Sequence, residues 1–348
     1  MRYLPLVILP LLFLFCEKRA TAPQLTVALD QTALRESPGE KSRSVRLLKK
    51  GERLSDLGAV GPFESVVQFD GKKRQAPWLQ VQTADGTTGW LFAGAVVPAD
   101  LRYDWLLQKR LLCYFGPALT ARRNELAVPL RDVPDEATFA ARLRANTALR
   151  DTLTQVLAHR PEPGEADILL DFTWLAEAVP GFVYQQVADG TQPWLFADYR
   201  HWLRLTQQTE GTQDDRYLAA CCTAFPADSI ESFFSAGKIQ LSDRAAASRL
   251  GEGQHLKMLQ AIDQALAAGP LFAPELAAQK AQVLEDIFGK NTRYWQPKEK
   301  IVSELGKILK APLRCLSDRD RSELSLRLAM FEQPEANGIQ VDLRSGGG

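Results

Sequence analysis

The residue types that most often do chemistry in proteins are sparse in this chain. Its 348 residues include three histidines, His159, His201 and His255. No two of them stand four residues apart, the spacing that places two imidazoles on one helix face for zinc. We expect His159 at a helix end, His201 at a contact between helices and His255 on the surface. These positions predict no metal site and no cofactor.

The cysteines likewise carry no recognisable motif. They are five in number, Cys16, Cys113, Cys221, Cys222 and Cys315, and none forms a C-x-x-C pair, so zinc is unsupported. A cysteine nucleophile needs a thiolate at a helix start with histidine nearby. Two of the cysteines instead fall late in a short, alanine-rich helical stretch. We therefore expect buried free thiols, although a disulfide among the last four is open if the chain leaves the cytosol.

Carboxylates leave one enzymatic alternative open. A glycoside hydrolase needs only two of them at a suitable separation, and Glu177 with Asp198, or Glu285 with Asp286, would supply the residue types. No motif surrounds either pair, and no glycine-rich phosphate loop is present. The sequence thus predicts a protein that is not an enzyme and has no catalytic residues.

The elements that would position a binding site lie early in the chain. Leu25, Val27 and Leu29 alternate with polar residues, as in a half-buried strand, and Asp85-Gly86 is a hairpin signal. Turn residues recur about every ten positions between short apolar runs. Residues 24–98 are therefore expected to form a small β barrel or sandwich.

Four motifs in this stretch give it a family resemblance. They are the run from Ala33 to Gly39 with Arg35 before a proline turn, the turn Leu48-Lys49-Lys50-Gly51-Glu52, the strand Trp78-Leu79-Gln80-Val81, and the hairpin Asp85-Gly86-Thr87-Thr88-Gly89-Trp90-Leu91. In this order they resemble the bacterial SH3 domain. The resemblance covers under a quarter of the chain. It implies an SH3-like β-barrel that binds a peptide or a peptidoglycan component in the cell envelope.

Aromatic side chains of the same stretch are the candidate ligand-binding residues, namely Phe63, Phe69, Trp78, Trp90 and Phe92. These aromatic side chains either line a groove or form the core of the barrel. The second arrangement is favoured, because a small barrel has few other residues with which to build a core. The stretch departs from the family by a longer segment between Ala59 and Pro77. There we expect an extra strand over Phe63–Phe69 and then a basic loop with Lys72, Lys73 and Arg74, either a solvated turn or a contact for an acidic partner.

The beginning of the chain predicts export. Arg2 precedes an apolar run from Leu4 to Phe15, which is shorter than the ~20 residues that cross a membrane. A basic start, a short apolar run and an abrupt polar switch are typical of a secretory signal. Cys16 stands at the switch, where the segment resembles the lipobox of bacterial lipoproteins, although Phe15 is bulkier than the usual residue. We expect residues 1–16 to be a lipoprotein signal with Cys16 acylated, residues 17–23 to be a tether, and the protein to be a lipid-anchored component of the periplasm or outer membrane.

The remaining two thirds of the chain reads as helical. Composition shifts toward Ala, Leu, Gln and Arg after Pro98, and we expect a helical domain over residues 101–333 and a flexible tail over 334–348. Expected helices are 103–115, 136–156, 166–178, 193–208, 214–225, 254–268, 274–288, 297–309 and 318–331, with a further helix start at 228–231 and an extended segment within 119–133. No fixed repeat is present, which argues against a solenoid.

Fold class and function follow from these expectations. The chain is predicted to be α+β and multidomain, an SH3-like barrel followed by a mostly helical domain. Its charges balance, with 42 basic and 42 acidic residues, which gives no field to attract nucleic acid. The sequence therefore favours a non-enzymatic envelope lipoprotein that binds a peptide or peptidoglycan-type ligand. The alternative is an envelope hydrolase that acts on peptidoglycan through an active site in the helical domain.

Overall fold

The computed structural model describes residues 23–69, 71–99, 104–127, 135–159, 170–187, 192–242 and 245–343. The chain separates into two compact units, residues 1–113 and 114–348. The expected signal, lipidation site and tether, residues 1–22 with Cys16, lie outside the described residues. The α+β class expected from the sequence is confirmed, because one unit is built on an antiparallel sheet and the other mainly on helices.

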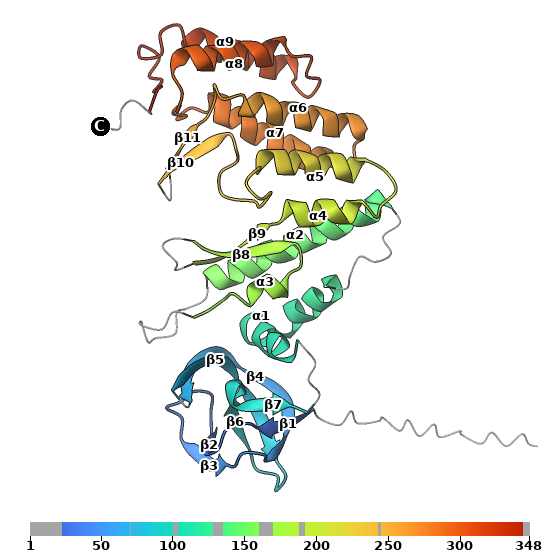
Figure 1. Cartoon of the computed structure of the whole chain (residues 1–348), viewed down its shortest axis with the longest axis vertical. Helices are drawn as coiled ribbons and strands as arrows, with labels where there is room; N and C mark the ends of the chain where they lie inside the picture. Colours follow the sequence, from blue (N-terminus) through green and yellow to red (C-terminus); the bar gives the residue numbers. More distant parts are fainter. Residues whose placement is uncertain are drawn as a thin grey trace, which may run out of the picture. The chain divides into compact units, whose positions relative to one another are not determined.

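One seven-stranded antiparallel sheet makes up most of the first unit (Figure 1). Its order is β3-β2-β6-β5-β4-β1-β7, so β3 and β7 are the edge strands. No hydrogen-bonded ladder joins these two edges in the described part of the chain. The strands are β1 (Gln24–Val27), β2 (Thr32–Arg35), β3 (Ser44–Leu48), β4 (Arg53–Phe69), β5 (Lys72–Thr83), β6 (Thr88–Phe92) and β7 (Val96–Pro98), with a short 3₁₀ helix, η1 (Ala93–Ala95), before the last.

Alternation of apolar residues builds the core of this unit. Leu25, Leu34, Leu79 and Leu91 are fully buried and come from four different strands. The hairpin between β5 and β6 turns at Asp85-Gly86, where Gly86 has a φ of 87° that favours glycine. The pKa of Asp85 is lowered to about 2, mainly because its carboxylate accepts a hydrogen bond from the Thr83 hydroxyl and, to a smaller extent, because it accepts one from the Thr87 amide. The turn signal read from the sequence thus fixes the register of the two strands.

The long β4–β5 hairpin corrects the expected extra strand. Phe63–Phe69 is the second half of β4, and Lys72, Lys73 and Arg74 are the first residues of β5 and do not form a loop. Register shifts between Asp56 and Val60, and between Val60 and Glu64, allow β4 to bend while it stays paired with β5. A bent continuous strand and two separate strands have the same alternation, so the pattern could not tell them apart.

Helix α1 (Trp105–Leu126) begins in the first unit, which includes its residues up to Cys113. Lys109 Nζ lies 2.6 Å from a buried Asp56 carboxylate oxygen, and Arg110 Nε lies 2.9 Å from Glu64 Oε1. The helix is kinked at Gly116, where φ is 71° and ψ is 177°. The extended segment expected within 119–133 is wrong as far as residue 126, because Pro117 restarts a helix after the kink.

The second unit is mainly helical, with two hairpins. Its elements are α2 (Glu136–Ala158), α3 (Leu175–Ala178), β8 (Phe182–Val187), β9 (Gln192–Ala197), α4 (Tyr199–Thr206), α5 (Gln213–Ala224), β10 (Lys238–Ser242), β11 (Ala245–Ser248), α6 (Gln254–Ala268), α7 (Ala273–Phe288), α8 (Lys298–Lys310) and α9 (Asp318–Met330). The expected helix over 166–178 is limited to α3 in the described residues.

Two expected helical segments of this unit are wrong. The helix expected over 193–208 begins only at Tyr199, because the preceding residues form β9 and pair with β8. The helix start expected at Asp228–Glu231 is a turn, with φ near 55° at Asp228 and Ser229. In the part of the expected tail that the structure describes, 334–343, Ile339 is buried and the Gln340 carbonyl accepts a hydrogen bond from the Tyr294 amide.

Candidate functional site

The five aromatic candidates pack on one another and on the core of the first unit. Trp78 and Phe92 are buried, while Phe63, Phe69 and Trp90 are partly buried against that core. Phe92 lies between two of the rings, with centroids 5.9 Å from Phe69 and 5.7 Å from Trp78. The Trp78 indole also donates a hydrogen bond of 2.9 Å to the Ser65 hydroxyl. These contacts leave Trp78 and Phe92 without an exposed face for a ligand.

The proline turn closes the space above these rings. A Cβ added at Gly61 would lie 3.2 Å from Cβ of Pro38 and 3.2 Å from Cβ of Trp78. One added at Gly39 would lie 3.6 Å from the Phe63 ring. A gap that is too tight for a methyl group cannot hold a peptide, so the turn and β4 do not form an open groove here.

Two exposed apolar side chains of the first unit lie close together on the edge strand β3, while two others lie singly, Leu57 on β4 and Val97 on β7. Val45 is 42% exposed and Leu47 is 59% exposed. Arg46 between them is held at 2.6 Å from Glu52 and 2.8 Å from Asp85. This surface could not be predicted, because apolar residues in a stretch expected to form strands can be either buried or exposed.

The cysteines of the second unit do not form a nucleophilic site. Burial raises the pKa of the Cys221 thiol to about 12, and the Gln279 amide donates to its sulfur at 3.1 Å. Burial also raises the pKa of Cys222, and raises that of Cys315 to about 12. The thiols of Cys221, Cys222 and Cys315 are free, and Cys221 is buried. The thiolate that a cysteine nucleophile requires is thus disfavoured at these three thiols.

A buried cluster contains the residue types of a Ser-His-Asp site, but in the wrong arrangement. Ser248 Oγ lies 3.5 Å from Nε2 of His255, while Asp286 is paired with Lys238 at 2.8 Å. His255 was expected on the surface and is fully buried, because the β10–β11 hairpin covers the start of α6. A Cβ at Gly237 would lie 3.0 Å from His255 Nε2 and 3.2 Å from Asp286 Oδ2. The cluster is therefore closed to a substrate and holds elements together.

The other two histidines also have structural surroundings. The His159 amide donates to the Gln155 carbonyl at the end of α2, in agreement with the helix-end position expected from the sequence. The ring of His201 lies edge-on to Trp202, with centroids 5.8 Å apart, and burial lowers its pKa. Neither imidazole has a hydrogen-bonded nucleophile among the contacts described.

Carboxylates in this unit act as helix caps. The buried Glu304 accepts hydrogen bonds from the amides of Gly251 at 2.5 Å, Gly253 at 2.7 Å and Leu256 at 3.1 Å, and so satisfies the start of α6. Asp198 accepts from the His201 amide and caps α4. Two carboxylate pairs were considered above for a glycoside hydrolase. One member of each pair, Asp198 or Asp286, is thus engaged in structural contacts.

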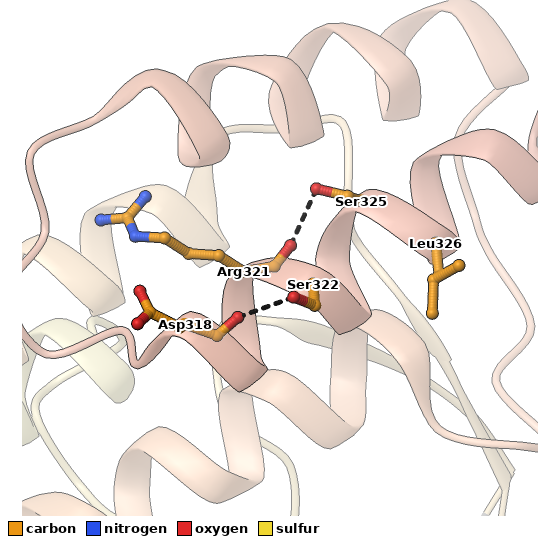
Figure 2. A pocket seen from close by; sticks show the side chains of 5 residues that line it. All are labelled: Asp318, Arg321, Ser322, Ser325 and Leu326. Atoms are coloured by element: carbon orange, nitrogen blue, oxygen red, sulfur yellow. Dashed lines mark hydrogen bonds between the residues drawn. The ribbon is translucent and has the colours of Figure 1, made fainter.

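An open pocket of about 620 Å³ lies on α9. Figure 2 shows the side chains that line it, Asp318, Arg321, Ser322, Ser325 and Leu326. The Arg321 guanidinium donates to carbonyls of Leu309, Ala311 and Leu313 at the end of α8. Both serine hydroxyls donate to carbonyls four residues earlier in their own helix. No nucleophile and base are hydrogen-bonded to each other in this pocket.

Comparisons with known proteins found no protein-family model, no curated protein and no solved structure that matches the chain. Within the described ranges, no group of three or more His, Cys, Asp or Glu side chains is arranged to hold a metal ion. In that same part of the chain, every helix is too short or too polar to span a bilayer.

Proposed function

We propose that this protein is a non-enzymatic lipoprotein of the cell envelope whose first unit is an SH3-like module that binds peptide. The four sequence motifs support the module. So does the order of elements, in which a tight hairpin joins β5 to β6 and a 3₁₀ helix precedes the last strand, which pairs with the first. Cys16 is proposed as the acylated residue that anchors the chain to the membrane.

The exposed edge strand β3 is the observation that carries the binding function. In the described residues β3 pairs only with β2, so its other edge presents backbone donors and acceptors. Val45 is the extra residue of a bulge, and regular pairing covers Arg46–Leu48. An extended peptide with an apolar side chain would add a short strand there and contact Val45 and Leu47. The stem peptide of peptidoglycan is the ligand that we propose.

Retention on purified sacculi tests this proposal. The full-length protein with Val45→Lys and Leu47→Lys should lose about tenfold in retained fraction, since two apolar contacts worth ~1.4 kcal/mol together would be removed. Leu57→Lys is the matched control, because Leu57 is also 42% exposed in the same unit but lies at the bend of β4. Equal loss in both variants, or no loss in the double variant, would overturn the role of β3.

The same preparation separates binding from hydrolysis. We expect the sacculi to remain intact after prolonged incubation with the full-length protein, as measured by release of soluble fragments. Release that disappears in a Glu177→Gln or Glu285→Gln variant, at the exposed member of each carboxylate pair, would establish the hydrolase alternative instead.

A further inference from the structure

The side chains of the β8–β9 hairpin in the second unit lie alternately on two faces. Cross-strand partners Gln185 and Trp194 share a face with the pair Val183 and Phe196, since side chains alternate along a strand. Leu195 on the opposite face is fully buried, and its carbonyl accepts from Arg150 of α2 at 3.4 Å. Figure 1 shows the hairpin beside α2. The face that carries Trp194 therefore points away from the helix.

Phe233 stands on this outward face. Its ring is edge-on to both Trp194 and Phe196, with centroid distances of 5.1 Å and interplanar angles of 64° and 78°. It is nevertheless 53% exposed, so one large aromatic surface faces solvent. Exposed rings fixed in such a cluster are typical of binding surfaces, because the protein gains little by leaving them in water.

The backbone next to Phe233 is firmly held. Glu231 forms a backbone hydrogen bond of 2.8 Å with the Ala197 carbonyl, and its carboxylate accepts from the Ala197 amide at 3.0 Å. The same carboxylate lies 2.6 Å from Arg150 Nη1. The segment that precedes Phe233 is therefore fixed to β9 through Ala197 and to α2 through Arg150.

The outward face carries no charged side chain among its described strand residues, which are Val183, Gln185, Val187, Gln192, Trp194 and Phe196. Its polar groups are amides, each of which both donates and accepts hydrogen bonds. We call Gln185, Gln192, Trp194 and Phe233 the aromatic platform, and the ring of Phe196, which is only 3% exposed, packs against Trp194 and Phe233. The neutrality of the platform disfavours anionic ligands, for which a cation would be required.

We propose that the aromatic platform binds a neutral glycan. A sugar ring has an apolar face of C–H groups that can lie against an aromatic ring, and equatorial hydroxyls that both donate and accept. The Phe233 ring supplies the apolar surface, and Gln185, directly opposite Trp194, supplies the matched amide. This site lies in the second unit and is independent of the peptide contact at β3.

Titration of the full-length protein with cellohexaose and with chitohexaose, followed by calorimetry, tests the proposal. We expect at least one of these neutral β-1,4-linked oligosaccharides to bind. Affinity should fall about tenfold or more in Phe233→Ala, which removes the stacking surface, and severalfold in Gln185→Ala, which removes the amide. Binding of only the acetylated sugar would show that the acetamido group is also recognised.

Leu326→Ala is the matched control, because Leu326 is a large apolar residue of the same unit and is 67% exposed. It should leave glycan affinity unchanged. The proposal is overturned if neither oligosaccharide binds, if Phe233→Ala binds as tightly as the parent protein, or if the platform residues govern binding of a neutral proline-rich peptide and not of a glycan. Sacculus retention by the β3 variants reports separately on the peptide contact.

Discussion

At the scale of single residues, His255 shows how burial decides what a side chain can do. Its imidazole is fully buried, and burial, then the positive charges of Lys238 and Arg249, lowers its pKa to about 3 from the ordinary 6.5. A histidine with so low a pKa stays neutral near pH 7 and cannot shuttle protons there. The depressed pKa does have a consequence for stability.

We predict that the second unit loses stability as pH falls from 6.5 toward 3. In that window the unfolded chain binds a proton at His255 that the folded chain excludes, so the unfolded state gains up to about 1.4 kcal/mol per pH unit. Asp286, whose pKa burial raises above the ordinary 3.8, acts in the opposite direction, because the folded chain binds its proton first as pH falls toward 3.8. Urea unfolding of the parent and of His255→Gln between pH 7.5 and 4.5 measures the effect. The variant should show the shallower dependence, and His159→Gln, at an exposed helix end, should match the parent. Equal slopes in all three proteins would refute the argument.

At the scale of elements, the start of α1 is part of the first unit rather than a linker. Lys109 and Arg110 on one helical turn meet Asp56 and Glu64 on β4, and all four side chains are largely removed from water. Trp105 and Leu106 of the same helix pack against the aromatic core. A buried carboxylate that loses its cation is strongly destabilising, whereas the intact pair contributes little net stability.

Lys109→Met is accordingly expected to destabilise the first unit by about 3–5 kcal/mol, because Asp56 would stay buried without its partner. Adding Asp56→Asn should recover most of this loss, since no unpaired charge then remains. Denaturant unfolding of the single and double variants measures both effects, with Lys72→Met at an exposed strand end as the control. Failure of the second substitution to restore stability would mean that packing of the Lys109 stem, and not the charge, is what matters.

Elements with a strong local signal could be predicted, and elements that depend on distant pairing could not. The α6 bounds follow from its apolar stripe and from Gly269-Pro270 after it, and α7 to α9 begin and end within one residue of their expected positions. Trp194 was assigned to a helix, because its spacing to Trp202 fits a helical face equally well. Only the pairing of β9 with β8 excludes that reading, and pairing is not written in a local pattern. The aromatic platform was missed for this reason, as was the exposure of Leu47, which depends on β3 being an edge strand.

At the scale of the whole molecule, the two compact units should respond independently to substitution. Lys109 lies in the first unit and Glu304 in the second. The described contacts of Lys109 and of Glu304 involve different partner residues. Mutational free energies add when sites are distant and have no common partner. If the first unit binds peptide and the second binds glycan, independent units allow both sites to be occupied at once, because binding at one site does not lower the affinity of the other.

We therefore predict two calorimetric unfolding transitions that can be shifted separately. Glu304→Gln should destabilise only the second, by about 1–3 kcal/mol, because an amide cannot replace a carboxylate that accepts from three backbone amides. Lys109→Met should shift only the first, and the double variant should show both shifts in full. Glu285→Gln, on the exposed side of α7, should move neither. A single transition that each substitution shifts as a whole would show that the units fold as one, and binding at β3 and at the platform would then be expected to be coupled.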